Sequence, residues 1–301
     1  MPKFYTSGPC IKEVKQWGKT GLKEVNFTDN TLLQNICDDK YASFNDLTYI
    51  SFSGCINLQA IPAGLFKYAK SITALDRVFE KCISLTLIPG NLFEGCTRLT
   101  SLYYAFEECT GISSLSEDLF NGCSKVTDFS GVFRECRGIT TLPGNLFEEC
   151  ISVISFASAF SGCNGLVSLP DDLFKDCHNV DNFNNTFSGC YGLVSIPENL
   201  FENCHDVTSF NNTFWYCSNL TTIPTGIFDN NRKVTDFSNT FYGCTCTGES
   251  PYTIIDGVKY HLYERYKNPD YFVSPRNYNS CFSYCYELSD LEEINANGWG
   301  N

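Results

Sequence analysis

Hydrophobic residues recur along most of the chain with a period of 27, divided into half-repeats of 14 and 13. Each half-repeat reads F-x-x-C-x-x-[LIV]-x-x-[LIF], so apolar side chains stand at every third position. One half leads into a proline, as in Ile196-Pro197, and the other contains a polar doublet such as Asn184-Asn185. Because one half-repeat alone is too short to enclose a core, the pattern predicts a solenoid in which each coil is one full repeat.

The same pattern predicts what each coil contains. Two short strands, V-T-x-F and L-x-x-I-P, are each followed by a helical or 3-10 turn that carries F-x-x-C. Proline has no N–H for a neighbouring strand, so it ends the second strand and forces a bend. Stacked coils would bury ladders of Phe, Leu, Ile and Cys, with strands about 4.8 Å apart. Since the period falls within the range of leucine-rich repeats, we expect an α/β repeat fold, a leucine-rich-repeat solenoid with capped ends.

Cysteine is frequent, with 18 residues, and most cysteines follow the repeat. Two columns run in steps of 27: Cys82, Cys109, Cys136, Cys163, Cys190, Cys217 and Cys244, and Cys96, Cys123, Cys150, Cys177 and Cys204. A continuous column cannot pair uniformly into disulfides, so we expect reduced thiols packed as small core residues. Cys55 stands one repeat before Cys82, and Cys285 resumes this column after an insertion. The remaining four cysteines stand off the columns and could be free, paired or metal-bound: Cys10, Cys37, Cys246 and Cys281.

The two ends of the chain are less regular than the middle. Residues 1–50 are expected to form an irregular N-terminal cap, and residues 51–245 the leucine-rich-repeat solenoid. Residues 246–301 are expected to hold a last repeat with an inserted tyrosine-rich hairpin that acts as a cap. Asp256-Gly257 between two apolar runs is the hairpin signal.

The net charge of −13 indicates which partners are excluded. Nucleic acid binding needs clustered Lys and Arg, and the chain has no basic run. No stretch approaches roughly 18 apolar residues, so we expect no membrane insertion. No apolar h-region follows Met1, so we expect no secretory signal. We expect a cell-surface, extracellular or virion location, with a cytoplasmic location or a trimmed chain left open.

Two segments resemble a known family. V-T-D-F-S-N-T-F-Y-G-C at Val234–Cys244 and F-x-x-C-x-x-L-T-x-I-P at Phe214–Pro224 resemble the BspA-type leucine-rich repeats of bacterial surface proteins. The likeness covers roughly residues 47–290. Similar repeats occur in surface or tail proteins of gut bacteriophages. The resemblance implies adhesion or partner recognition and brings no catalytic residues with it.

The sequence gives little support for a catalytic or a metal-binding site. The chain has no G-x-S-x-G, H-E-x-x-H, P-loop or G-x-G-x-x-G motif, so we expect no enzyme and no cofactor. His178 and His205 lie one full repeat apart and could form a metal pair, but no third ligand accompanies them, which favours two surface positions. Cys246 and Cys281 could complete a zinc site with Cys244 and Cys285, which the core columns already explain. We expect no metal.

A strip of polar residues is the first candidate binding surface. Aligned side chains suited to hydrogen bonding with a glycan or peptide are Asn184, Asn185, Asn211, Asn212 and Asn239. The alternative is that these residues cap turns and solvate the face.

An aromatic cluster is the second candidate. Trp215 and Tyr242 hold the same position in successive coils, with Tyr216 and Tyr191 nearby. Exposed Trp and Tyr are common anchors of binding sites, although the inserted hairpin could cover them instead. We therefore expect a non-enzymatic recognition or adhesion module that binds a protein or glycan on a cell surface. The alternative is a structural part of a phage virion or surface assembly, in which this cluster contacts another subunit.

Overall fold

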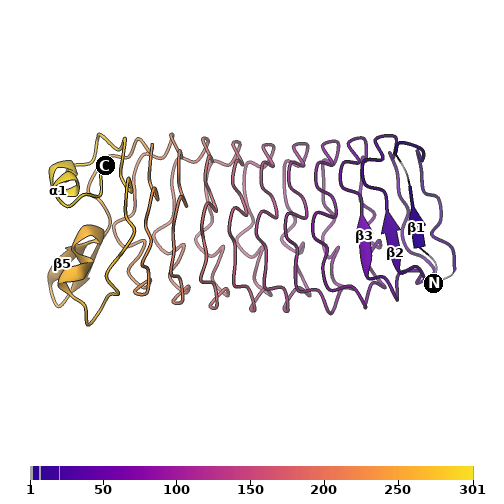
Figure 1. Cartoon of the computed structure of the whole chain (residues 1–301), viewed down its shortest axis with the longest axis horizontal. Coiled ribbons are helices and arrows are strands. Elements are labelled where there is room, and N and C mark those ends of the chain that lie inside the picture. The colour runs from indigo at the N-terminus through magenta and orange to yellow at the C-terminus, as the bar shows by residue number, and fades with distance from the viewer. Residues whose placement is uncertain (1–2, 7, 20, 301) are drawn as a thin grey trace.

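The computed structural model describes residues 3–6, 8–19 and 21–300 as a long rod of stacked coils, with the two ends of the chain at opposite ends of the rod (Figure 1). At the N-terminal end, strands β1 (Lys3–Tyr5), β2 (Glu24–Asn26) and β3 (Tyr49–Ser51) form a parallel sheet in the order β1-β2-β3. No helix in the described residues is long and apolar enough to cross a membrane.

Beyond β3 the sheet continues only as single bridges between residues of successive coils. One column joins Ala74, Ser101, Asp128, Ser155, Asn182, Ser209 and Asp236, each one full repeat from the next. In the L-x-x-I-P half, bridges join Ser168 to Ser195 and Thr222 to Thr247. The strands are shorter than expected because polar side chains in the bridge column from Ala74 to Asp236 accept a hydrogen bond from the backbone N–H two residues later. Asn182 Oδ1, for example, accepts from Asn184 N at 2.9 Å.

Within residues 51–245, all of which the structure describes, the F-x-x-C segments are single turns that do not continue into α- or 3-10 helices, so the expected helical turns are not confirmed. Some of their backbone N–H groups donate to a carbonyl of the next coil, and others donate to a carbonyl within the same turn. Phe187 N donates to Thr213 O of the next coil at 2.9 Å, whereas Cys190 N donates to Phe187 O at 3.1 Å. The residue before each Cys of the first column also has a positive φ, as at Gly189. A helix cannot propagate through a left-handed residue.

The core consists of stacked side chains, as the repeat predicts. One ladder of phenylalanines comprises Phe52, Phe79, Phe106, Phe133, Phe160, Phe187, Phe214, Phe241 and Phe282. Neighbouring rings in this ladder are 5.4–5.8 Å apart. The column cysteines are buried and free, which confirms the expected core role. Each thiol of the first column donates to a Phe carbonyl of the previous coil, as Cys190 Sγ does to Phe160 O at 3.2 Å.

The C-terminal insertion contains the predicted hairpin, made of β4 (Tyr252–Ile255) and β5 (Val258–His261) on either side of Asp256-Gly257. The 3-10 helix η1 (Leu262–Lys267) follows, and α1 (Leu291–Ala296) lies close to the C-terminus. In Figure 1 the hairpin and α1 both lie at the C-terminal end of the rod, with α1 above the hairpin.

A single side chain covers the end of the last full repeat, in the half that contains Phe228 and Asn231. Arg265 of η1 is fully buried, and its guanidinium donates to Asn231 O at 2.9 Å and Phe228 O at 2.7 Å. One coil earlier, the Asn231 amide donates in the same way to Cys204 O and Phe201 O. The guanidinium therefore takes the place of the side chain that a further coil would supply, and satisfies carbonyls that would otherwise be buried without donors.

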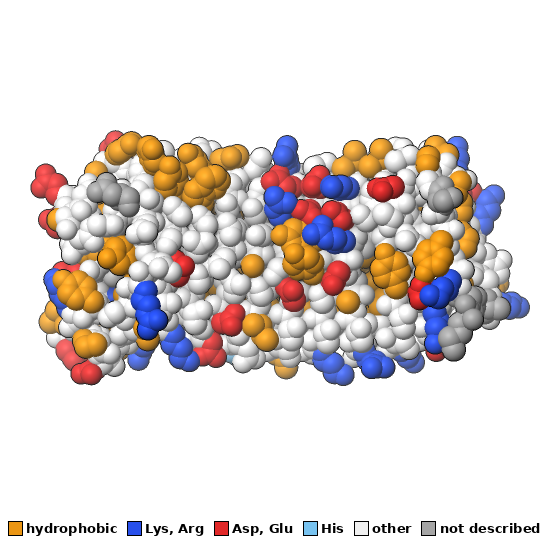
Figure 2. Space-filling view, in the orientation of Figure 1, with side chains coloured by type: hydrophobic (Ala, Val, Ile, Leu, Met, Phe, Trp, Pro, Cys, Tyr) orange, Lys and Arg blue, Asp and Glu red, His pale blue; other side chains and the backbone are white. Residues whose placement is uncertain are grey.

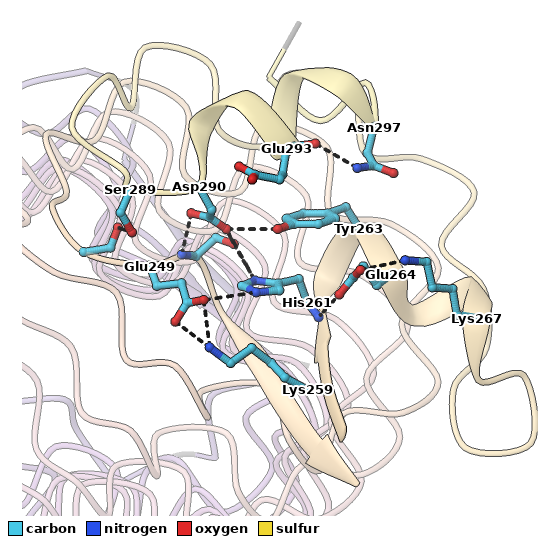
Figure 3. Close-up of polar contacts among 12 residues, drawn as sticks. Glu249, Lys259, His261, Tyr263, Glu264, Lys267, Ser289, Asp290, Glu293 and Asn297 are labelled. Atoms are coloured by element: carbon cyan, nitrogen blue, oxygen red, sulfur yellow. Dashed lines mark hydrogen bonds and ion pairs between the residues drawn. The ribbon is translucent and has the colours of Figure 1, made fainter. Parts of the chain in front are cut away.

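A buried polar cluster ties the hairpin to the start of α1 (Figure 3). His261 at the end of β5 lies between two carboxylates, with Nε2 3.3 Å from Glu249 Oε1 and Nδ1 3.4 Å from Asp290 Oδ2. The hydroxyls of Ser250 and Tyr263 both donate to Asp290 Oδ2. Burial, together with the Asp290 carboxylate, raises the pKa of Tyr263, so this hydroxyl stays protonated as a donor.

Candidate functional site

The predicted aromatic residues form part of a continuous group. The rings of Trp215 and Tyr242 are nearly parallel, with centroids 6.3 Å apart and an angle of 23° between them. The Tyr216 ring lies 4.3 Å from Trp215 and 5.4 Å from Tyr242. Tyr191 is exposed, but no ring contact joins it to this group in the part of the chain that the structure describes.

Two further tyrosines, which the sequence analysis missed, extend the group onto the last coil. The Tyr284 ring lies 4.9 Å from Tyr242, and the Tyr286 ring lies 5.9 Å from Tyr284. Alignment of the repeats could have identified Tyr284, because it precedes Cys285 as Tyr216 precedes Cys217. We call Trp215, Tyr216, Tyr242, Tyr284 and Tyr286 the aromatic shelf. In the described residues, the ring contacts of Tyr242 are all within the shelf, so the inserted hairpin does not stack on it.

The backbone beneath the shelf is unusual for tyrosine. Tyr216 and Tyr284 have φ values of 54° and 66°, in a column where Gly162, Gly189 and Gly243 have φ near 70°. A side chain on Gly243 would crowd the Tyr216 ring, because a Cβ there would lie 3.0 Å from Tyr216 Cδ1. Gly243 therefore leaves the space in which the Tyr216 ring lies.

An open pocket of about 490 Å³ adjoins the shelf. Tyr242, Tyr284 and Tyr286 line it together with Leu291 and Asn295 of α1. The neighbouring Tyr284 hydroxyl raises the pKa of Tyr242 to about 12. Figure 2 shows hydrophobic side chains gathered along one edge of the rod near its C-terminal end.

Three of the candidate asparagines have a structural role. Asn185, Asn212 and Asn239 have φ values of 58°, 55° and 56°. Asparagine is one of the few residues with a side chain that adopts this left-handed conformation readily. Residues at the same position in earlier coils, such as Arg77 and Ser158, share the conformation. These amides therefore stand where the turn requires a tolerant residue.

The other two asparagines are partly committed to contacts between coils. Asn184 Oδ1 accepts from Ser209 Oγ at 2.5 Å. Asn211 Nδ2 donates to Ser238 O at 3.2 Å, and Asn211 Oδ1 accepts from Asn212 Nδ2 at 2.5 Å. All five asparagines are half-buried. The polar strip therefore has less free hydrogen-bonding capacity than its sequence indicated.

The structure brings together one set of residues with a catalytic composition. The Ser250 Oγ lies 3.0 Å from His261 Nδ1, and the same hydroxyl donates to Asp290. Ser250 is fully buried, and a nucleophile must be reached by its substrate. The cluster therefore acts as a structural clamp between β5 and α1.

The residues weighed as metal ligands also have other roles. Cys244, Cys246 and Cys285 each donate a thiol proton to a backbone carbonyl. His178 and His205 are both exposed. Among the described residues, no three His, Cys, Asp or Glu side chains are grouped so that they could hold a metal ion.

Comparison with known proteins places the chain in a family. Residues 15–235 match the family described as BspA type Leucine rich repeat region, in six copies. Among solved structures, a chain of the Drosophila Toll–Spatzle complex is 20% identical with a TM-score of 0.42; the match covers 89% of this chain and 38% of that one. No curated protein matches.

Two bacterial structures also match. A leucine-rich repeat protein from Bacteroides ovatus is 15% identical, with a TM-score of 0.26 and coverage of 91% of this chain and 82% of that one. A leucine rich cell surface protein from Faecalibacterium prausnitzii is 14% identical, with a TM-score of 0.22 and coverage of 81% and 86%. The assignment depends on the repeat match, which spans more than half of the chain: the protein belongs to the BspA-type leucine-rich-repeat family.

Proposed function

We propose that the protein is a recognition module at a cell surface, which binds a protein or a glycan and catalyses no reaction. The aromatic shelf is the observation that carries this proposal. Five aromatic rings, each in contact with at least one other, extend over successive coils, and Tyr216, Tyr284 and Tyr286 are exposed. Contiguous exposed aromatic side chains are typical anchors of binding surfaces.

The left-handed turn beneath the shelf belongs to the repeat rather than to the shelf, because Lys81, Glu108 and Glu135 adopt it at the same position in earlier coils. A left-handed conformation costs a residue with a side chain roughly 1–2 kcal/mol, and Tyr216 and Tyr284 bear this cost as those residues do. The residues that we propose for binding are the shelf and the neighbouring Tyr191, Asn184, Asn185, Asn211, Asn212 and Asn239.

A structural role in a phage virion or surface assembly is the second candidate. In that case the shelf would be covered by another subunit, and its exposure in a single chain would reflect the missing neighbour. BspA-type repeat proteins are a family typically without catalytic activity, and this family trait is compatible with both candidates.

The test compares the wild type with Trp215→Ala/Tyr242→Ala and a control pair, Tyr41→Ala/Tyr49→Ala. The control residues are exposed tyrosines at the N-terminal end of the rod. Light scattering gives the mass of each folded variant, and flow cytometry measures how labelled protein binds bacterial and epithelial cells. We expect a monomer whose cell binding is lost only in the shelf variant. A wild-type oligomer that the shelf variant dissociates would favour the assembly role.

A further inference from the structure

The pocket beside the aromatic shelf has walls of two kinds. Tyr284 and Tyr286, which are 55% and 69% exposed, present aromatic rings on one side. Asn295 of α1 and Ser280 contribute an amide and a hydroxyl. A ligand in this pocket would therefore meet aromatic rings together with polar groups that both donate and accept hydrogen bonds.

The charge of the pocket narrows the class of ligand. The described residues that line it include no Lys, Arg, Asp or Glu. An anionic ligand would lack a cationic partner, and the chain as a whole carries a net charge of −13. A cationic ligand would meet rings but no carboxylate in the lining. The chemistry best matched is a neutral ligand with several hydroxyl groups.

The spacing of the aromatic rings favours a ligand that is long enough to contact several of them. The Trp215 and Tyr242 rings belong to successive coils, and the Tyr284 ring meets Tyr242 edge to face, with centroids 4.9 Å apart and an angle of 64° between the rings. Aromatic faces carry negative charge density that attracts the C–H edges of a sugar ring. An extended chain of sugar units can contact several of these rings in turn, whereas a single unit would use one or two.

We propose that the pocket and the aromatic shelf bind a neutral oligosaccharide, with C–H faces against the rings and hydroxyls on Ser280, Asn295 and the tyrosine hydroxyls. This inference rests on the proposed function and names the ligand class of the same surface. Tyr284 and Tyr286 form the pocket end of the site, and Trp215 and Tyr242 continue it along the rod.

The experiment titrates the full chain with cellohexaose, xylohexaose, mannohexaose and chitohexaose, with choline and a lysine-rich peptide as cationic probes. Calorimetry measures affinity, and a tryptophan fluorescence change that is lost in Trp215→Phe reports contact at Trp215, which is one of three tryptophans in the chain. The pocket variant is Tyr284→Ala/Tyr286→Ala. Tyr266→Ala, an exposed tyrosine of η1 that does not line the pocket, is the control.

We expect at least one hexasaccharide to bind, and the pocket variant to weaken it about tenfold or more while the control leaves it unchanged. Binding that survives in the pocket variant, or binding of the cationic probes alone, would overturn the inference. Failure of all four saccharides while Trp215→Ala/Tyr242→Ala still abolishes cell binding would overturn the ligand class and leave the proposed function standing. If every variant keeps both saccharide binding and cell binding, the inference and the proposed function are both overturned.

Discussion

Alkaline pH should destabilise this protein at values where most folded proteins are little affected, because its core is built on thiols. Sixteen of the 18 cysteines are buried. Burial raises the pKa of fifteen of them, to about 12 at Cys96, Cys190 and Cys204. The folded state therefore holds these protons where the unfolded state, with a thiol pKa of about 8.5, releases them.

The size of the effect follows from proton linkage. A pKa that is raised on folding contributes stability that is complete below the unfolded value and is lost as the pH rises toward the folded value. Between about pH 7 and pH 8.5 each such thiol costs about 0.4 kcal/mol of unfolding free energy, and fifteen cost about 6 kcal/mol. That loss is comparable with the whole stability of a typical domain, about 5–15 kcal/mol.

Urea unfolding followed by circular dichroism, at both pH values and with a phosphine reductant present, measures this loss. The four-fold variant Cys96→Ala/Cys123→Ala/Cys150→Ala/Cys177→Ala should reduce the pH-dependent loss by about 1.6 kcal/mol. Alanine fits this column, because the native Ala69 occupies it and is fully buried. Cys10→Ser, at an exposed cysteine, should change nothing. Equal unfolding free energies at the two pH values would refute the reasoning.

Two further predictions concern single side chains. Arg265→Met should lower the unfolding free energy by about 2–5 kcal/mol in urea titration, because it leaves the buried carbonyls of Phe228 and Asn231 without donors; a loss below about 1 kcal/mol would show that the guanidinium is not needed to close the solenoid. Tyr216→Gly should leave stability unchanged or raise it by up to about 1 kcal/mol, because glycine removes the left-handed strain. Calorimetric melting checks this, and destabilisation by more than about 2 kcal/mol would make Tyr216 a structural residue.

The core was predictable because each column repeats one environment many times. Phe187 and Cys190 are buried for the same reason as their equivalents in every coil, so the period alone identifies them. The hairpin was predictable because Asp256-Gly257 acts locally through its own backbone preference. In both cases the information lies within a few residues or in the repeat itself.

The turns could not be predicted in the same way. F-x-x-C has helical spacing, yet Phe187 N donates to Thr213 O of the next coil, and no local pattern shows where an N–H will find its partner. Arg265 resembles any surface arginine in the sequence, and its role depends on the end of a solenoid lying beneath it. The extension of the shelf to Tyr284 was available from the register, which the C-terminal insertion displaced.

The way the array ends also explains why the shelf is open. The two halves of the coil end at different points. The half that contains Phe241 continues for one more coil, in which the Phe282 ring stacks on Phe241. The half that contains Phe228 ends there, where Arg265 covers it. The insertion can therefore cap one side of the rod while the other side carries an extra coil. Tyr284 lies on that extra coil, in contact with Tyr242. If the insertion had closed both halves at the same coil, the shelf would lose the member that forms the wall of its pocket. The cap and the aromatic shelf are thus consequences of the same unequal ending.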